Sequence, residues 1–155
     1  MFLDVEKVLK EKYGLVLPKP PSPAGLYSPI VQTGNLVYIS GQACTVNGEP
    51  VFTGKLGDDM TVEQGQEAAR IATINCLSLL KAYLKDLNKV KKIVQLIGYV
   101  KSADGFMDQP KVMNGASQLL LDVFGDRGAH SRLALGTNEL PGGASVELYF
   151  IAEVE

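Results

Sequence analysis

The spacing of apolar and polar residues changes several times along the chain. Residues 3–13 carry apolar side chains at helical spacing, and Asp4 is placed to cap the resulting short amphipathic helix. Four prolines between positions 18 and 23 follow and predict an extended, polyproline-like segment. Residues 1–23 are therefore expected to form an extension ahead of the main pattern.

Two strand patterns come next. The stretches IVQTG and NLVYIS predict two strands joined at Thr33-Gly34-Asn35, a composition typical of hairpin turns. The second strand ends in Ser40-Gly41-Gln42, which either closes the strand with a glycine bulge or brings backbone and hydroxyl close to a ligand. Another turn is predicted at Asn47-Gly48.

The pattern then changes to a helical period. From residue 61 to about residue 87 a broad apolar face predicts a long helix, which Thr61 caps together with Gln64. β-Branched residues favour a strand of about ten residues from Val90 onward. A second helix is predicted over about 110–123, because a proline stands in its first turn.

The last part of the chain predicts a pair of strands. The stretches SRLALGT and ASVELYFIAEV are separated by NELPGG and are expected to pair as an antiparallel hairpin. The expected order is β-β-α-β-α-β-β after the N-terminal helix. Helices that cover one face of a mixed sheet make this an α+β fold with two layers, and 155 residues fit a single domain.

The predicted hairpin carries the candidate chemistry. Symmetry about Glu139-Leu140 places Arg132 directly opposite Glu147. Alternation puts both on one face with Tyr149 and puts the apolar side chains on the other face, namely Leu133, Leu135, Val146, Leu148 and Phe150. Two interpretations remain open. The pair is a solvated ion pair of little value, or Arg132 offers a planar fork to a carboxylate while Glu147 handles a proton nearby.

Composition narrows the classes of function. A net charge of −2 argues against nucleic acid and anionic membranes as partners, and no apolar run reaches membrane-spanning length. Cys44 and Cys76 lack CxxC spacing and are expected to be buried free thiols. The N-terminus resembles no targeting peptide, so a cytoplasmic protein is expected.

Motifs for common cofactors are missing. No phosphate-binding glycine motif occurs, and one histidine with two scattered cysteines makes no typical zinc site. We therefore expect no metal and no cofactor. His130 is interpreted as an ordinary surface or capping group rather than as part of a Ser-His-Asp triad.

Several separate motifs point to one family. They are GLYSP, VYISGQ, YVKS, the asparagine of VMNG, and SRLALGTNELPGGASVELYFIAEV. Together they resemble the YjgF, or Rid (reactive intermediate deaminase), family, also labelled endoribonuclease L-PSP. The pattern R-x7-LP-x5-[VI]-E matches through Arg132, Leu140-Pro141 and Val146-Glu147. The N-terminal extension resembles the longer subgroup of this family.

The resemblance implies a chorismate-mutase-like fold and a homotrimer whose intersubunit clefts bind small carboxylates or imines. It implies that Arg132 grips the carboxylate and that Glu147 positions the attacking water. The other family pocket residues fall on Tyr27, Ser40, Gly41 and Asn114. Deaminase members often carry a cysteine two residues after the arginine; here Ala134 stands there, and either its backbone supplies the contact or substrate choice has changed.

The expected activity is hydrolysis of a reactive 2-imino acid to a 2-oxo acid and ammonia. The alternative is a non-catalytic trimer that binds a small carboxylate metabolite or a partner protein through the same arginine. Such a clamp gains little from a carboxylate beside an anionic ligand, so Glu147 favours chemistry. Ribonuclease activity is disfavoured, because the chain has one histidine and no basic patch with interleaved aromatics.

Overall fold

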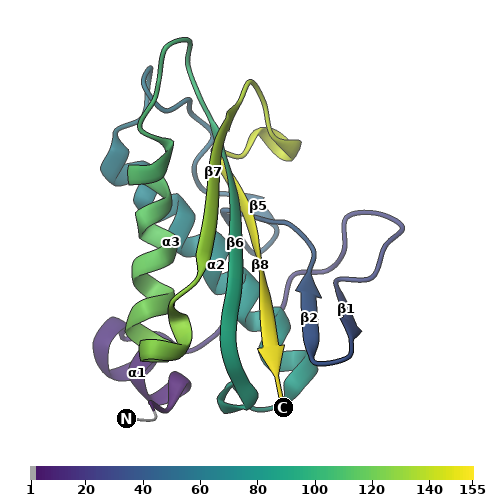
Figure 1. Ribbon diagram of the computed structural model, residues 1–155. Coiled ribbons are helices and arrows are strands. Elements are labelled where there is room, and N and C mark those ends of the chain that lie inside the picture. Colours follow the sequence, from purple (N-terminus) through teal and green to yellow (C-terminus); the bar gives the residue numbers. More distant parts are fainter. Residues whose placement is uncertain (1–2) are drawn as a thin grey trace.

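The computed structural model describes residues 3–155 and has two layers, a mixed sheet and a helical layer (Figure 1). Met1 and Phe2, the first residues of the predicted extension, lie outside the described residues. The sheet runs β1-β2-β8-β6-β7, with β3 also paired to β8. Its strands are β1 (Ile30–Thr33), β2 (Leu36–Ile39), β3 (Gln42–Ala43), β6 (Val90–Lys101), β7 (Ser131–Thr137) and β8 (Val146–Val154). Only β6 and β7 pair in parallel, so the α+β prediction with a mixed sheet is confirmed.

The helices lie on one side of the sheet. Helices α2 (Val62–Leu84) and α3 (Gln109–Phe124) pack against it, and α1 (Val5–Tyr13) lies beside α3 (Figure 1). A separate short ribbon pairs β4 (Thr45–Val46) with β5 (Glu49–Pro50) across the predicted turn. The short 3-10 turns are η1 (Leu87–Lys89), η2 (Gly125–Gly128) and η3 (Pro141–Gly143).

The predicted helix caps are present. The Asp4 carboxylate accepts a hydrogen bond from the backbone of Lys7, and the helix that follows buries Val5. Thr61 and Gln64 form a reciprocal capping box at the start of α2. This helix ends at Leu84, earlier than predicted, because Lys85 adopts a left-handed conformation. The prediction ran on to residue 87 because Leu87, a buried residue of η1, continues the apolar pattern beyond the helix.

The N-terminal helix is attached to the helical layer by polar contacts. The Tyr13 hydroxyl donates a hydrogen bond to Asp122 on α3, and Lys12 pairs with the same carboxylate at 2.9 Å. Burial, together with the Asp122 contact, raises the pKa of Tyr13. The neutral phenol that donates to Asp122 is thereby favoured, so α1 is held on the domain by more than its two buried apolar residues.

The predicted terminal hairpin is wrong. Strand β7 pairs with β6 in parallel and β8 pairs with β6 in antiparallel fashion, so β6 separates the two strands. Helix α3 supplies the crossover that a parallel β6–β7 pair requires. The segment from 138 to 145 therefore spans about 10 Å over the end of β6 rather than making a tight turn. Gly142 and Gly143 allow this path with φ of 68° and 77°.

The two faces of the sheet differ. Alternate residues of β8, beginning with Val146, are buried under the helices, and those between them point to the opposite side. No helix among the described residues covers that side, which we call the open face (Figure 1). Its exposed apolar side chains are Val31, Tyr38, Tyr99, Leu133 and Leu135. The prediction that Leu133 and Leu135 share a face with Val146 is therefore wrong.

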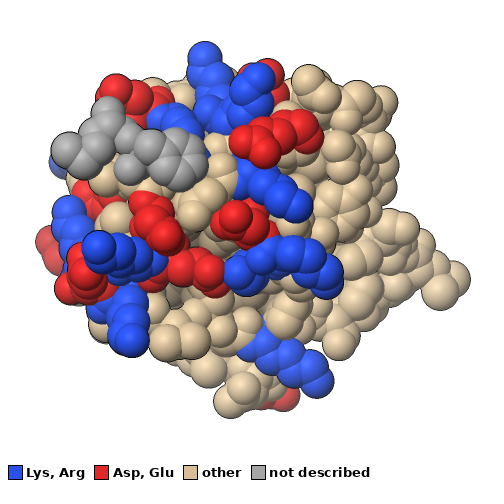
Figure 2. Space-filling view, turned by 90° about the horizontal axis from the view of Figure 1, so that it is seen from below, with Lys and Arg blue, Asp and Glu red and all other residues tan. Residues whose placement is uncertain are grey.

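Surface charge is mixed where it can be seen. Figure 2 views the molecule from below. Lys and Arg are interleaved with Asp and Glu on the left of this view, whereas the right part is almost uncharged. Both cysteines are buried free thiols, as predicted. Among residues 3–155, no helix is both long and apolar enough to cross a membrane.

Candidate functional site

Arg132 lies on the edge strand β7, and its side chain reaches helix α3. Its Nη1 donates to the Asn114 side chain at 2.8 Å and to the Ser117 hydroxyl at 3.1 Å, and its Nη2 donates to the Pro110 carbonyl at 3.2 Å. All three acceptors are uncharged. Within residues 3–155, no carboxylate pairs with Arg132, and its Nε–H has no hydrogen-bond acceptor. The Nε–H lies on the edge from which a guanidinium donates in parallel, through Nε and Nη2, to the two oxygens of a carboxylate.

The expected contact between Arg132 and Glu147 is wrong. Arg132 is level with Leu96 of β6, whereas Glu147 is level with Tyr99. The register also places the two side chains on opposite faces, because Leu96 is buried under the helices and Tyr99 is on the open face. The ion-pair interpretation fails for this reason, and so does a site made from both groups within one chain.

Glu147 is half-buried on the open face of β8. It lies opposite Tyr99 and Ala43, and a side-chain carbon added at Gly41 would meet its carboxyl carbon at 3.5 Å. Burial raises the pKa of the Glu147 carboxyl. No cation or hydrogen-bond donor contacts this carboxylate among the described residues. A desolvated carboxylate with a raised pKa is a suitable proton acceptor.

Ser40 and Gly41 form a bulge beside that carboxylate. Tyr38 pairs with Ile151 and Gln42 with Leu148, so four steps along this strand correspond to three along β8. One extra residue is therefore inserted, which confirms the bulge interpretation of Gly41. The Gln42 amide donates to the Ser40 hydroxyl at 3.2 Å, which leaves the hydroxyl proton of Ser40 available to a ligand.

Tyr27 lies on the segment before β1, two residues ahead of Pro29. The Ser40 backbone donates to the Pro29 carbonyl at 2.8 Å, which attaches the segment before β1 to the bulge. The Tyr27 ring is half exposed, and its hydroxyl accepts from the Ala24 backbone at 3.2 Å. This segment projects beyond β1 (Figure 1), so its side chains are available to a neighbouring molecule.

The predicted residues other than Tyr27 therefore fall into two clusters. The edge cluster lies on β7 and α3 and consists of Arg132, Ala134 and Asn114. The bulge cluster lies beside β8 on the open face and consists of Ser40, Gly41 and Glu147, whereas Tyr27 lies on the projecting segment before β1, outside both clusters. Ala134 is level with Gly98 and packs against the core, so its side chain lies on the helical side of the sheet like that of Arg132.

The sequence reasoning missed two groups that support Arg132. Ser117 lies three residues after Asn114 on α3, and both side chains accept from the same Nη1. His130 contacts Ser117 in turn, at 2.9 Å. The i, i+3 spacing of Asn114 and Ser117 was a usable signal, because such residues share a helix face.

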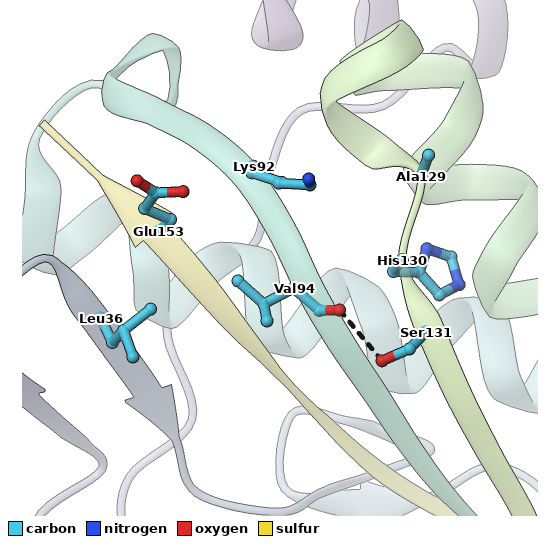
Figure 3. Close-up of a pocket in the computed structure, with 7 residues that line it drawn as sticks. All are labelled: Leu36, Lys92, Val94, Ala129, His130, Ser131 and Glu153. Carbon is cyan, nitrogen blue, oxygen red and sulfur yellow. Dashed lines mark hydrogen bonds between the residues drawn. The ribbon is translucent and has the colours of Figure 1, made fainter.

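A hollow of about 620 Å³ lies elsewhere on the open face (Figure 3). Its lining residues are Leu36, Lys92, Val94, Ala129, His130, Ser131 and Glu153. Lys92 and Glu153 are register neighbours of opposite charge, and Ser131 donates to the Val94 carbonyl at 3.2 Å. None of the predicted site residues lines the hollow. Because Arg132 and Glu147 do not line it, we do not place the reaction there.

Comparison with known proteins identifies the family. The model of the family described as "YjgF/chorismate_mutase-like, putative endoribonuclease" matches residues 9–154. The protein TCP17 of Trypanosoma cruzi is 39% identical over 145 residues, which cover 93% of this chain and 91% of that protein. The 2-iminobutanoate/2-iminopropanoate deaminase of Dermatophagoides farinae is 29% identical over 139 residues, 89% of this chain and 93% of that one.

Solved structures agree with this assignment. The crystal structure of Atu1372 from Agrobacterium tumefaciens, whose function is unknown, superposes with a TM-score of 0.91 and 39% identity over 97% of this chain and 92% of that one. The family match and the superposition confirm the predicted fold and the resemblance seen in the sequence. The chain belongs to the YjgF/chorismate mutase-like family.

Proposed function

We propose that this protein is a deaminase that hydrolyses small 2-imino acids to 2-oxo acids and ammonia in clefts between subunits of a homotrimer. The observation that carries the proposal is the guanidinium of Arg132. Three uncharged oxygens hold it, no carboxylate of the described chain neutralises it, and its Nε–H has no acceptor among the described residues. A small carboxylate matches that edge in charge and geometry. The deaminase relative supplies the imine as substrate class.

The position of Glu147 supports the part of the proposal that involves a second copy of the chain. Its carboxylate is on the open face, whereas the Arg132 guanidinium is on the helical side of the edge strand. A small imino acid cannot contact both within one subunit. In the proposed trimer, the edge cluster of one subunit faces the bulge cluster of the next, and the ligand lies between them.

The proposed chemistry needs only these residues. An enamine tautomerises to the 2-imino acid, whose carboxylate binds Arg132. Glu147 accepts a proton from water as the water oxygen adds to the imine carbon, and that proton is returned to the nitrogen. Glu147 then takes the hydroxyl proton of the resulting carbinolamine and passes it to the nitrogen as the carbon–nitrogen bond breaks and the carbonyl forms, so that ammonia and the 2-oxo acid leave. Spontaneous hydrolysis is already fast, so positioning and one proton acceptor suffice.

The direct test is a turnover assay. Imines are generated in situ from several amino acids by an amino acid oxidase, and the disappearance of each imine is followed with and without the protein. We expect a rate above the spontaneous one for at least one small aliphatic imine. If every imine disappears at the spontaneous rate, with the carboxylate product still bound by the protein, the non-catalytic binding function replaces this proposal.

The trimer has its own prediction. Leu133 and Leu135 on the open face are 45% and 44% exposed. Contact with another subunit would bury this apolar surface. We expect Leu133→Asp to convert the trimer to monomer at micromolar concentration, as measured by light scattering. Leu121→Asp is the control, because Leu121 is 42% exposed but lies on helix α3. A parent protein that is already monomeric would contradict the intersubunit site.

A further inference from the structure

A line of hydrogen bonds extends from Arg132 into the protein. The Arg132 Nη1 donates to the Ser117 hydroxyl at 3.1 Å, the hydroxyl contacts the His130 Nε2 at 2.9 Å, and the His130 Nδ1 contacts the Gly128 carbonyl at 2.6 Å. Figure 3 shows His130 at the start of β7, with its ring on the side of the neighbouring helix. The line therefore joins β7, α3 and η2 behind the edge cluster.

The direction of each hydrogen bond follows from the Gly128 carbonyl, at which the line ends. The Gly128 carbonyl can only accept, so the proton of a neutral His130 is on Nδ1. Nε2 then has a lone pair and accepts the proton of the Ser117 hydroxyl. With its own proton directed to His130, the Ser117 oxygen presents lone pairs to Arg132, and a guanidinium can only donate. With a neutral ring, every donor in the line has one acceptor, and the other tautomer would leave the Gly128 carbonyl without a donor from His130.

We infer that Ser117 and His130 are positioning residues for Arg132, which set the orientation in which its bidentate edge meets a carboxylate. The inference rests on the function proposed for Arg132. A long arginine side chain at a sheet edge loses much rotamer freedom when it binds a ligand. Ser117 restrains Nη1 before the ligand arrives. His130 restrains the hydroxyl rotor, which would otherwise be free to direct its proton toward the guanidinium.

The two positioning residues have different expected effects. Ser117→Ala removes the acceptor itself, so we expect the dissociation constant for a 2-oxo acid such as pyruvate to rise about three- to tenfold. His130→Ala acts only through the hydroxyl, and about a two- to threefold rise is expected. In the Ser117→Ala background, His130→Ala should add nothing, because its only connection to Arg132 has been removed.

Calorimetric titration with pyruvate measures these constants, and thermal unfolding checks that each variant is folded. Ser117→Thr keeps the hydroxyl and should restore parent affinity. Gln118→Ala is the matched control on the next helical position, where the amide bonds Asp122 rather than Arg132. In the imine assay, the single variants should raise KM and leave kcat within about twofold.

Two results would overturn the inference. One is parent affinity in Ser117→Ala while Arg132→Ala binds no pyruvate, an outcome that leaves the proposed function intact. The other is a His130 ring protonated at Nε2 at neutral pH, which nitrogen-15 NMR of the free protein reports without any ligand. If Arg132→Ala binds pyruvate as the parent does, the proposed function fails first and the positioning role fails with it.

Discussion

Arg132→Ala is expected to lower the affinity for small carboxylates by about ten- to a hundredfold and to lower kcat/KM for imines by at least as much. A charge-assisted bidentate contact in a partly desolvated cleft contributes about 1.5–3 kcal/mol, and about 1.4 kcal/mol corresponds to a factor of ten. No neighbouring group can replace it, because the three residues that hold Arg132 offer only acceptors to it. Calorimetry with pyruvate and initial rates with imines measure the two quantities.

Two further substitutions sharpen this result. Arg132→Lys keeps the charge but loses the fork, so we expect an intermediate affinity. Arg70→Ala is the matched control, because that guanidinium is already paired with Glu67 through Nε at 2.8 Å on the helical layer. Equal losses in Arg70→Ala and Arg132→Ala would mean that the arginine effect is general electrostatics, and the carboxylate site would have to be sought elsewhere.

Glu147→Gln is expected to reduce turnover by about a hundredfold or more while leaving pyruvate affinity within a few-fold. Glutamine keeps the shape of the side chain but accepts no proton at neutral pH. The environment favours this interpretation, since Glu147 is desolvated and no cation of the described chain contacts it. Single-turnover rates with a small imine, set against the spontaneous rate, measure the loss.

The pH dependence supplies a second test of Glu147. Burial raises the pKa of its carboxyl, and proton acceptance requires the ionised form. The rate should therefore fall as pH is lowered through that raised pKa, and the glutamine variant should lack this decline. The sign for stability is opposite: ionised Glu147 costs desolvation energy in the folded state, so the variant should be more stable than the parent at neutral pH and equal to it in acid.

The non-catalytic alternative makes a different prediction for the same variant. A protein that only binds carboxylates should keep or gain affinity in Glu147→Gln, because a negative charge near the anion has been removed. It should also show no turnover to lose. A parent rate that survives unchanged in the variant would remove Glu147 from the mechanism, whatever the ligand affinity.

Local sequence signals predicted most of the elements. The Thr61 and Gln64 capping box, the Asn47-Gly48 turn and the hairpin at Thr33-Gly34-Asn35 all occur where the sequence predicts them. Each depends on contacts between residues a few positions apart, so the residues themselves contain the information. The Arg132 position at the start of a strand was likewise predicted from alternation and from the family motif.

The pairing of the last two strands could not be predicted in this way. The loop NELPGG looks like a hairpin connection, and nothing local excludes one. Strand β6 takes both neighbours because its helical side is buried along its length and its two edges each need a hydrogen-bonding partner. That requirement arises between residues 36 to 64 positions apart along the chain, from the Gln95–Ser131 pair to the Val90–Val154 pair.

The sequence by itself left the bulge at Gly41 as one of two interpretations, but it predicted most of the elements, the buried cysteines and the identity of the candidate arginine and glutamate. The tertiary structure alone decided that these two side chains point to opposite faces of the sheet and that Ser117 and His130 stand behind the arginine. The physical reason is that side-chain direction in a sheet follows from register with the neighbouring strand. A change of partner moves Arg132 from the face of Glu147 to the face of helix α3.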